Sequence, residues 1–98
     1  MLTFPWDENT AKLNIKKHGV TFEEAKAVFY DDYARIIEDP DHSEAGNRFL
    51  ILGFSAERKM LIVSHCYLED EKIIRIISAR KAEKKEEKQY WSFYEKRI

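Results

Sequence analysis

Apolar residues recur along the chain in runs that predict five stretches of extended structure. Each run is short, rich in β-branched or aromatic residues, and bounded by charged or turn-forming residues. We expect strands over residues 2–6, 34–38, 48–54, 60–68 and 73–80. The last run contains four isoleucines, which favours a central strand covered on both sides. Pro40 ends the second run, and a polar connection is expected from there to Gly46.

Helix signals flank this β-rich region on both sides. Asp7 is a good cap for a helix over 9–17, and Gly19 suits the left-handed residue that ends it. Thr21 and Glu24 have the spacing of a capping box before a second helix over 22–30. Residues 82–98 are helical by composition, with Tyr90 in an apolar stripe. The order predicts an α+β fold: an antiparallel meander of four to five strands, two N-terminal helices and one C-terminal helix.

The two longest strands are joined by Glu69-Asp70-Glu71, which we interpret as a tight turn. If the turn is centred on Asp70, His65 and Arg75 face each other across the strand pair and share one sheet face. A two-residue turn would shift the pairing by one residue and place the two side chains on opposite faces. Both registers stay open at the level of sequence.

Arg75 is an unexpected residue in so apolar a strand, because a guanidinium stays charged and needs an acid or an anion beside it. With His65 nearby, and Arg80 and Lys81 at the strand end, it would form a cationic face suited to a phosphodiester. Arginines would stabilise transition-state charge, and imidazole would move protons. The alternative is structural: His65 is a satisfied strand residue, and Arg75 pairs with an internal acid.

Composition narrows the class of protein but not its activity. The 98 residues predict one domain, 1–98. The net charge of −1 is too small to indicate whether a binding partner is acidic or basic. The single cysteine, Cys66, favours a reducing compartment, and no leader or membrane-span pattern is present, so we expect a cytoplasmic protein. The three histidines are far apart and no phosphate-binding glycine loop occurs, so neither a metal site nor a cofactor is predicted.

Several short blocks, in this order and nearly spanning the chain, resemble the BrnT family of toxins from bacterial type II toxin–antitoxin systems. These toxins are similar in fold to the RelE group of messenger-RNA endonucleases. The blocks are Phe4-x-Trp6-Asp7, Lys17-His18-Gly19-Val20-x-Phe22, His42-Ser43-Glu44 and Arg75-Ile76-Ile77-Ser78-Ala79-Arg80-Lys81-Ala82, followed by Glu86 and Tyr90.

The resemblance implies a ribonuclease that needs no metal, uses the ribose 2′-hydroxyl as nucleophile and leaves a cyclic phosphate. On the matching positions, it implies His65 as the proton-transfer group, with Arg75 and Arg80 on the scissile phosphate. Flanking phosphates would be held by lysines, and Tyr90 would stack on a base, donate a proton or, as its helical spacing favours, pack in the core. The predicted lysines are Lys12, Lys81, Lys84 and Lys85.

The resemblance also implies a partner, a BrnA antitoxin with a ribbon-helix-helix DNA-binding domain. It would mask the toxin, and operator DNA would be bound only through the complex. The competing hypothesis is a catalytically silent module that only binds such a partner. A small DNA-binding regulator is disfavoured, because no helix-turn-helix with a basic recognition helix is evident.

Overall fold

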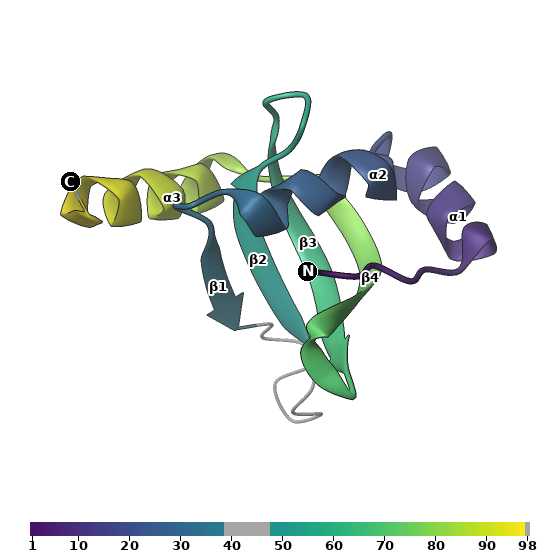
Figure 1. Cartoon of the computed structure of the whole chain (residues 1–98). Helices are drawn as coiled ribbons and strands as arrows, with labels where there is room; N and C mark the ends of the chain where they lie inside the picture. The colour runs from purple at the N-terminus through teal and green to yellow at the C-terminus, as the bar shows by residue number, and fades with distance from the viewer. Residues whose placement is uncertain (39–47, 98) are drawn as a thin grey trace.

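Four antiparallel strands form a single meander in the computed structural model, which describes residues 1–38 and 48–97 (Figure 1). Neighbouring strands in sequence are neighbours in the sheet, in the order β1-β2-β3-β4. The strands are β1 (Arg35–Glu38), β2 (Phe49–Phe54), β3 (Met60–Leu68) and β4 (Asp70–Lys81). The predicted α+β class and meander are therefore confirmed. The predicted connection at 39–46 and the block His42-Ser43-Glu44 lie outside the described residues.

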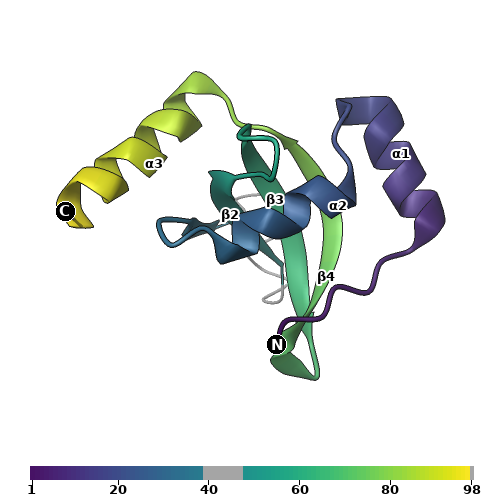
Figure 2. The same cartoon turned by 45° about the horizontal axis from the view of Figure 1, so that its top comes forward.

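The predicted first strand over residues 2–6 contributes only one bridging residue. Thr3 pairs in parallel with Ile73, its N–H donating to the Lys72 carbonyl at 2.8 Å and its carbonyl accepting from Ile74 N–H at 2.8 Å. Figure 2 shows the N-terminal segment running beside β4 on its way to the first helix. The prediction that the isoleucine-rich strand is central is therefore wrong: β4 is the last strand of the sheet.

Helix α1 (Glu8–His18) has the predicted caps, Asp7 and Gly19, and is one residue longer at each end than the predicted range 9–17. The Asp7 carboxylate accepts a hydrogen bond from Thr10 N–H at 2.9 Å, which satisfies one of the unpaired donors of the first turn. Gly19 closes the helix in the left-handed conformation, with φ 68°, and its N–H donates to the Ile15 carbonyl at 2.8 Å. These local signals are sufficient to define both ends of α1.

A buried asparagine, rather than an apolar stripe, anchors α1 to the sheet. Leu13 and Ile15 are 61% and 47% exposed, whereas Asn14 is 4% exposed. The Asn14 amide donates to the Ala79 carbonyl at 2.8 Å and to the Val20 carbonyl at 2.9 Å, and it accepts from Ala79 N–H at 3.0 Å. The Asn14 side chain thus forms hydrogen bonds with the backbone N–H and carbonyl of Ala79 at the outer edge of β4, as a neighbouring strand would.

Replacing Asn14 by alanine is expected to lower the free energy of unfolding by about 3 kcal/mol, because it leaves three buried backbone groups without partners. Urea denaturation measures the change. Leu13→Ala on the exposed side of the same helix is the control, and it should shift stability by less than about 0.5 kcal/mol. Equal losses in the two variants would show that Asn14 is not the anchor.

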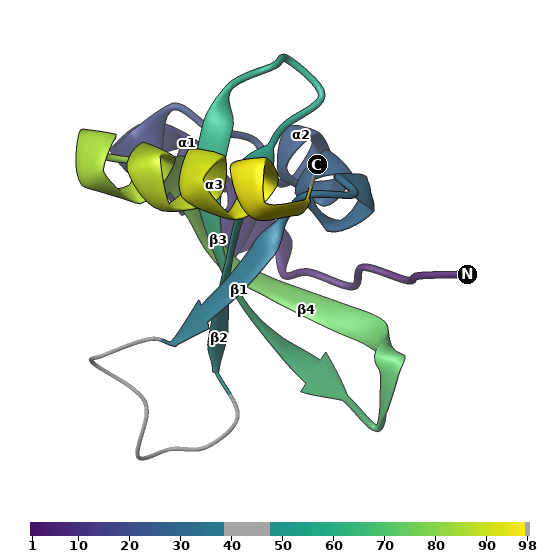
Figure 3. The same cartoon turned by 90° about the vertical axis from the view of Figure 1, so that its left-hand side faces the viewer.

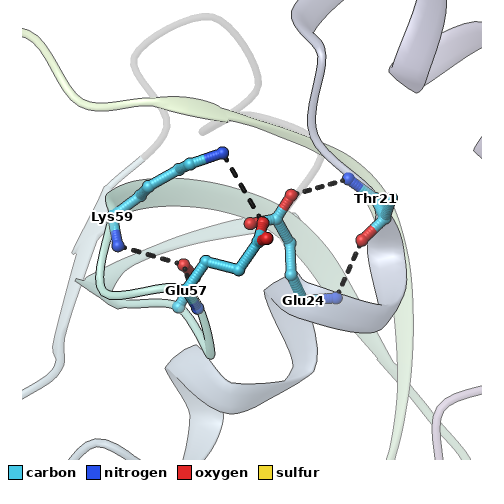
Figure 4. A network of polar contacts seen from close by, with 5 residues as sticks. Thr21, Glu24, Glu57 and Lys59 are labelled. Atoms are coloured by element: carbon cyan, nitrogen blue, oxygen red, sulfur yellow. Dashed lines mark hydrogen bonds and ion pairs between the residues drawn. The ribbon is translucent and has the colours of Figure 1, made fainter.

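The predicted second helix is split into two kinds of helix. Helix α2 (Phe22–Ala25) continues directly into the 3-10 helix η1 (Lys26–Tyr30). The predicted capping box is present: Glu24 N–H donates to Thr21 Oγ1 at 3.0 Å, and Thr21 N–H donates to Glu24 Oε1 at 3.1 Å (Figure 4). Together with α1, these helices bury one side of the sheet, hereafter the helix-covered face. Its core includes Val20, Phe22, Val28, Leu61, Val63 and Ile76.

Helix α3 (Lys84–Arg97) packs on the opposite side of the sheet through Tyr90, which is 3% exposed and contacts Leu52 and Ile62. The Tyr90 hydroxyl donates to the Asp31 carboxylate, 2.9 Å from Oδ2. Figure 3 shows α3 crossing only one end of the sheet. We call the rest of this side, where no described helix covers β2–β4, the open face. Among the described residues, no helix has the length and apolar character needed to cross a bilayer.

Candidate active site

Arg75 and His65 lie on opposite faces of the sheet, so of the two registers that the sequence left open, the face-to-face one does not occur. The observed pairs are Cys66 with Arg75 and His65 with Ile76. The turn is tighter than predicted, since Leu68 already pairs with Asp70 around Glu69 (φ 50°), and the register shifts again between Ser64 and His65. Because side chains alternate along a strand, the one-residue change moves Arg75 to the other side.

His65 is buried on the helix-covered face. Its side chain is 0% exposed, and its ring packs edge-on against Phe29 and Tyr67, with centroid distances of 4.8 and 5.3 Å. Nδ1 lies 3.1 Å from the Val63 carbonyl, which favours the tautomer with the proton on Nδ1. Nε2 has no hydrogen-bond partner among the described residues. In this position, the imidazole has no surface in common with Arg75.

The His65 environment predicts a specific pH dependence of stability. Burial lowers the pKa of His65 below the ordinary value of 6.5. The unfolded chain therefore takes up a proton that the folded chain resists, and stability falls as the pH drops from 6.5 through the lower folded pKa. The contribution of one such group has a slope of at most about 1.4 kcal/mol per pH unit. His65→Gln should remove this component, and identical slopes in urea titrations from pH 7.5 to 5 would contradict it.

Arg75 extends from the open face into a hollow of about 330 Å³. The side chain is exposed, and it makes no ion pair with an acid in the described part of the chain. This hollow is lined by Asp7, Thr10, Arg48, Cys66, Arg75, Ile76 and Ile77. A second hollow adjoins Arg75 and is lined also by Trp6 and Leu68. A guanidinium that is exposed and not engaged by a described acid is ready to bind an anion.

Asp7 lines both hollows with Arg75, and it brings the start of α1 to this site. Its Oδ2 accepts hydrogen bonds from the backbone N–H and the hydroxyl of Thr10, at 2.9 and 3.0 Å. These hydrogen bonds, and to a smaller extent the charge of Arg75, hold the pKa of Asp7 below its usual value. The group is therefore a carboxylate at neutral pH, positioned beside a cation.

Arg80 is engaged by an acid of α3. Its Nη1 and Nη2 donate to the two carboxylate oxygens of Glu86, each at 2.9 Å. This bidentate pair raises the pKa of Arg80 and lowers that of Glu86. In this state, the guanidinium joins the end of β4 to the start of α3, and both of its terminal nitrogens are occupied.

The remaining predicted contacts are spread over the molecule. Lys12 is exposed on α1, Lys81 is exposed at the end of β4, and Lys84 and Lys85 are exposed in the first turn of α3. Tyr90 lies in the core, where burial and the Asp31 carboxylate raise its pKa. Burial of Tyr90 agrees with the packing alternative in the sequence interpretation and leaves its phenol away from the surface.

The residues that surround Arg75 in the structure therefore differ from the predicted site residues. Asp7, Thr10, Arg48 and Cys66 line the hollow with Arg75 and were not among the predicted site residues. Asp7 stands beside Trp6 in the first block of the resemblance, but its spacing to the helix suggested capping alone. Arg48 and Cys66 had no sequence signal beyond their strands. No group of three metal-ligating side chains occurs among the described residues.

The comparisons identify the class of protein that this fold and cationic site belong to. The family model described as "Ribonuclease toxin, BrnT, of type II toxin-antitoxin system" matches residues 6–86. The chain belongs to this family, and it is thus a ribonuclease toxin of a type II toxin–antitoxin system. No curated protein matches it.

A solved relative confirms the architecture. The protein in the crystal structure of the Brucella abortus ribonuclease toxin BrnT is 20% identical in sequence, and the two structures superpose with a TM-score of 0.65. The match covers 85% of this chain and 99% of the Brucella chain. At this identity, the likeness concerns the fold: a four-stranded meander with two helices before it and one after it.

Proposed function

We propose that the chain is a metal-independent endoribonuclease that cleaves RNA through the ribose 2′-hydroxyl. The 2′-oxygen forms a bond to the adjacent phosphorus while the bond from phosphorus to the 5′-oxygen breaks. The leaving 5′-oxygen takes up a proton from water, so the products are a 2′,3′-cyclic phosphate and a 5′-hydroxyl. The observation that supports this most strongly is Arg75, exposed in a hollow on the open face and unpaired with any described acid.

In this proposal, Arg75 binds the scissile phosphate and stabilises the additional negative charge of the pentacoordinate transition state. Arg48 lines the same hollow and adds to its positive potential. Asp7 accepts the proton of the 2′-hydroxyl, because it is the carboxylate that lines the hollow with Arg75. The carboxylate and the guanidinium are thus close enough to act on one nucleotide.

The roles of His65 and Arg80 in catalysis stay predictions. His65 would have to leave an enclosed aromatic environment to reach a phosphate. Arg80 would have to exchange the Glu86 carboxylate for a phosphate, which has similar acceptor geometry. Lys12, Lys81, Lys84 and Lys85 are exposed and can contact flanking phosphates, with a salt dependence that reflects their number.

The Arg80 prediction can be tested through its partner. Glu86→Gln keeps a hydrogen-bond acceptor but removes the charge, so Arg80 becomes more available to an anion. If Arg80 binds phosphate, this variant should bind RNA several-fold more tightly at low salt, and Arg80→Ala should reverse the gain. Filter binding with an uncleavable oligonucleotide measures both. Unchanged affinity in Glu86→Gln would leave Arg80 only its structural role between β4 and α3.

The proposal includes an antitoxin partner with a ribbon-helix-helix domain, as the family resemblance implies. Such a partner would neutralise the toxin by covering the open face, and only the complex would bind operator DNA. Both proteins would act in the cytoplasm. In this arrangement, RNA and the antitoxin compete for the same surface, so a bound antitoxin should prevent cleavage.

The reaction type is tested with purified protein, a defined RNA and EDTA in the buffer. Cleavage is expected to persist with EDTA, to give cyclic phosphate and 5′-hydroxyl ends, and to stop when the ribose at the cut carries a 2′-O-methyl group. Ends carrying a 5′-phosphate, or cleavage at the methylated position, would overturn the proposed mechanism. Antitoxin binding without any RNA cleavage would instead support the silent-module alternative.

A further inference from the structure

Another cationic hollow lies at the C-terminal end of β4, away from the turn that joins β3 to β4. It has a volume of about 330 Å³ and lies between the turn after β2, the end of β4 and helix α3. Its floor is apolar and its rim carries three cations and one acid. The lining residues are Phe54, Arg58, Lys59, Met60, Lys81, Ala82, Glu87 and Trp91. We refer to it as the Trp91 pocket.

Trp91 is exposed although the adjacent Tyr90 fills the core. Its side chain is 43% exposed, and the ring makes tilted or edge contacts with Phe54, Tyr90 and Tyr94 at centroid distances of 5.9, 5.1 and 5.6 Å. These contacts with neighbouring rings fix the position of the indole. An indole that is fixed in position and still partly exposed provides a platform for a flat ligand.

Arg58 occupies a backbone position that favours glycine or asparagine. Its φ is 61°, in the left-handed region, which is uncommon for a side chain of this size. The turn is fixed by buried Ser55, whose N–H donates to the Lys59 carbonyl at 2.8 Å and whose carbonyl accepts from Arg58 N–H at 3.0 Å. Arg58 makes no ion pair with a described acid. The turn therefore presents a cation at the pocket rim.

The pocket opens on the same side of the sheet as Arg75. Phe54 and Met60 pair across β2 and β3, and both pack with Leu52 and Ile62 in the core beneath α3. Lys81 lines the pocket and follows Arg75 by six residues along β4, with one bulge between them, although it pairs with Leu61 of the helix-covered face; the separation along the strand is roughly 20 Å. A single strand of RNA held at Arg75 and directed along β4 would reach this pocket after a few nucleotides.

We propose that the Trp91 pocket is a subsite for RNA that flanks the cleaved phosphate. One base stacks on the indole of Trp91, and neighbouring phosphates contact Arg58 and Lys81. This inference rests on the proposed function, because it assumes that RNA binds at Arg75. An acidic segment of the antitoxin would also satisfy the cationic rim, but alignment with Arg75 along β4 favours the molecule that is bound there.

The test compares two substrates in steady-state cleavage: a dinucleotide that reaches only Arg75 and an RNA of about ten nucleotides. Trp91→Ala is expected to lower kcat/KM for the longer RNA by roughly 5- to 150-fold, mostly through KM, and to leave the dinucleotide unaffected. Trp91→Phe keeps a ring and should recover part of the loss. Arg58→Ala should reduce the slope of log affinity against log salt by about 0.7 for the longer RNA.

Three outcomes would overturn the subsite. Equal cleavage of the longer RNA by wild type and Trp91→Ala would do so, as would an equal loss on both substrates. So would a loss of affinity confined to the antitoxin, which would assign the pocket to the protein partner. If Trp91→Ala does not fold, the salt slope of Arg58→Ala decides the question. Failure of the proposed function looks different, since Arg75→Ala would then cleave both substrates as well as wild type.

Discussion

Replacing Arg75 by alanine is expected to lower kcat for RNA cleavage by roughly 100- to 1,000-fold, the usual effect of removing one group that stabilises transition-state charge. The side chain is exposed and unpaired with any described acid, so the variant should fold with nearly wild-type stability. Single-turnover cleavage and urea denaturation measure the two effects separately. The same variant should lose growth arrest when it is expressed in cells.

Two control variants sharpen this prediction. Arg75→Lys keeps the charge but not the planar pair of donors, so it should recover only part of the rate. Lys16→Ala removes an exposed cation near the C-terminal end of α1, outside both hollows beside Arg75, and should cleave like wild type. If Arg75→Ala and Lys16→Ala cleave equally well, Arg75 does not bind the scissile phosphate.

Replacing Asp7 by asparagine is expected to lower kcat by roughly 100- to 10,000-fold, the range that general-base catalysis contributes. Asparagine caps a helix as well as aspartate does, so α1 should remain intact. The expected loss thus arises from the missing base and not from a missing cap. Asp7→Ala removes both the base and the cap, and it should be less stable than Asp7→Asn.

The pH dependence distinguishes Asp7 from His65 as the base. Hydrogen bonds from Thr10 lower the pKa of Asp7, so the wild-type rate should stay level as the pH falls until it approaches that low pKa. An acidic limb that disappears in His65→Gln, together with normal cleavage by Asp7→Asn, would show that the imidazole and not Asp7 is the base. Circular dichroism of both variants excludes loss of fold as the cause.

The parts of the fold that sequence predicted well are the parts that local chemistry determines. Asp7, Gly19 and the Thr21–Glu24 capping box each act within a few residues, and all three are present in the structure. The four strands after residue 34 were predicted from apolar runs, which determine burial on a sheet. The attachment of α1 to the sheet was not predicted, because its anchor Asn14 bonds to Ala79, 65 residues away.

The register of the β3–β4 hairpin shows why the site was only partly predictable. Apolar side chains point to both faces of these strands, so no burial pattern fixes which residues pair. The tight turn at Glu69 and the register shift beside His65 depend on the folded backbone. Arg75 was recognised as the unusual residue, but the residues around it come from α1 and from Arg48 just before β2, which no local pattern connects to β4.

RNA is expected to bind at the open face around Arg75, and an NMR titration would locate the binding surface. ¹⁵N-labelled protein would be titrated with an uncleavable 2′-O-methyl oligonucleotide. Shifts are expected at the first turn of α1 and at Cys66 and Arg75, and they should be absent at Ala25 of α2 and Phe29 of η1, on the other side of the sheet. Shifts concentrated at Ala25 and Phe29, with none near Arg75, would contradict RNA binding at the open face.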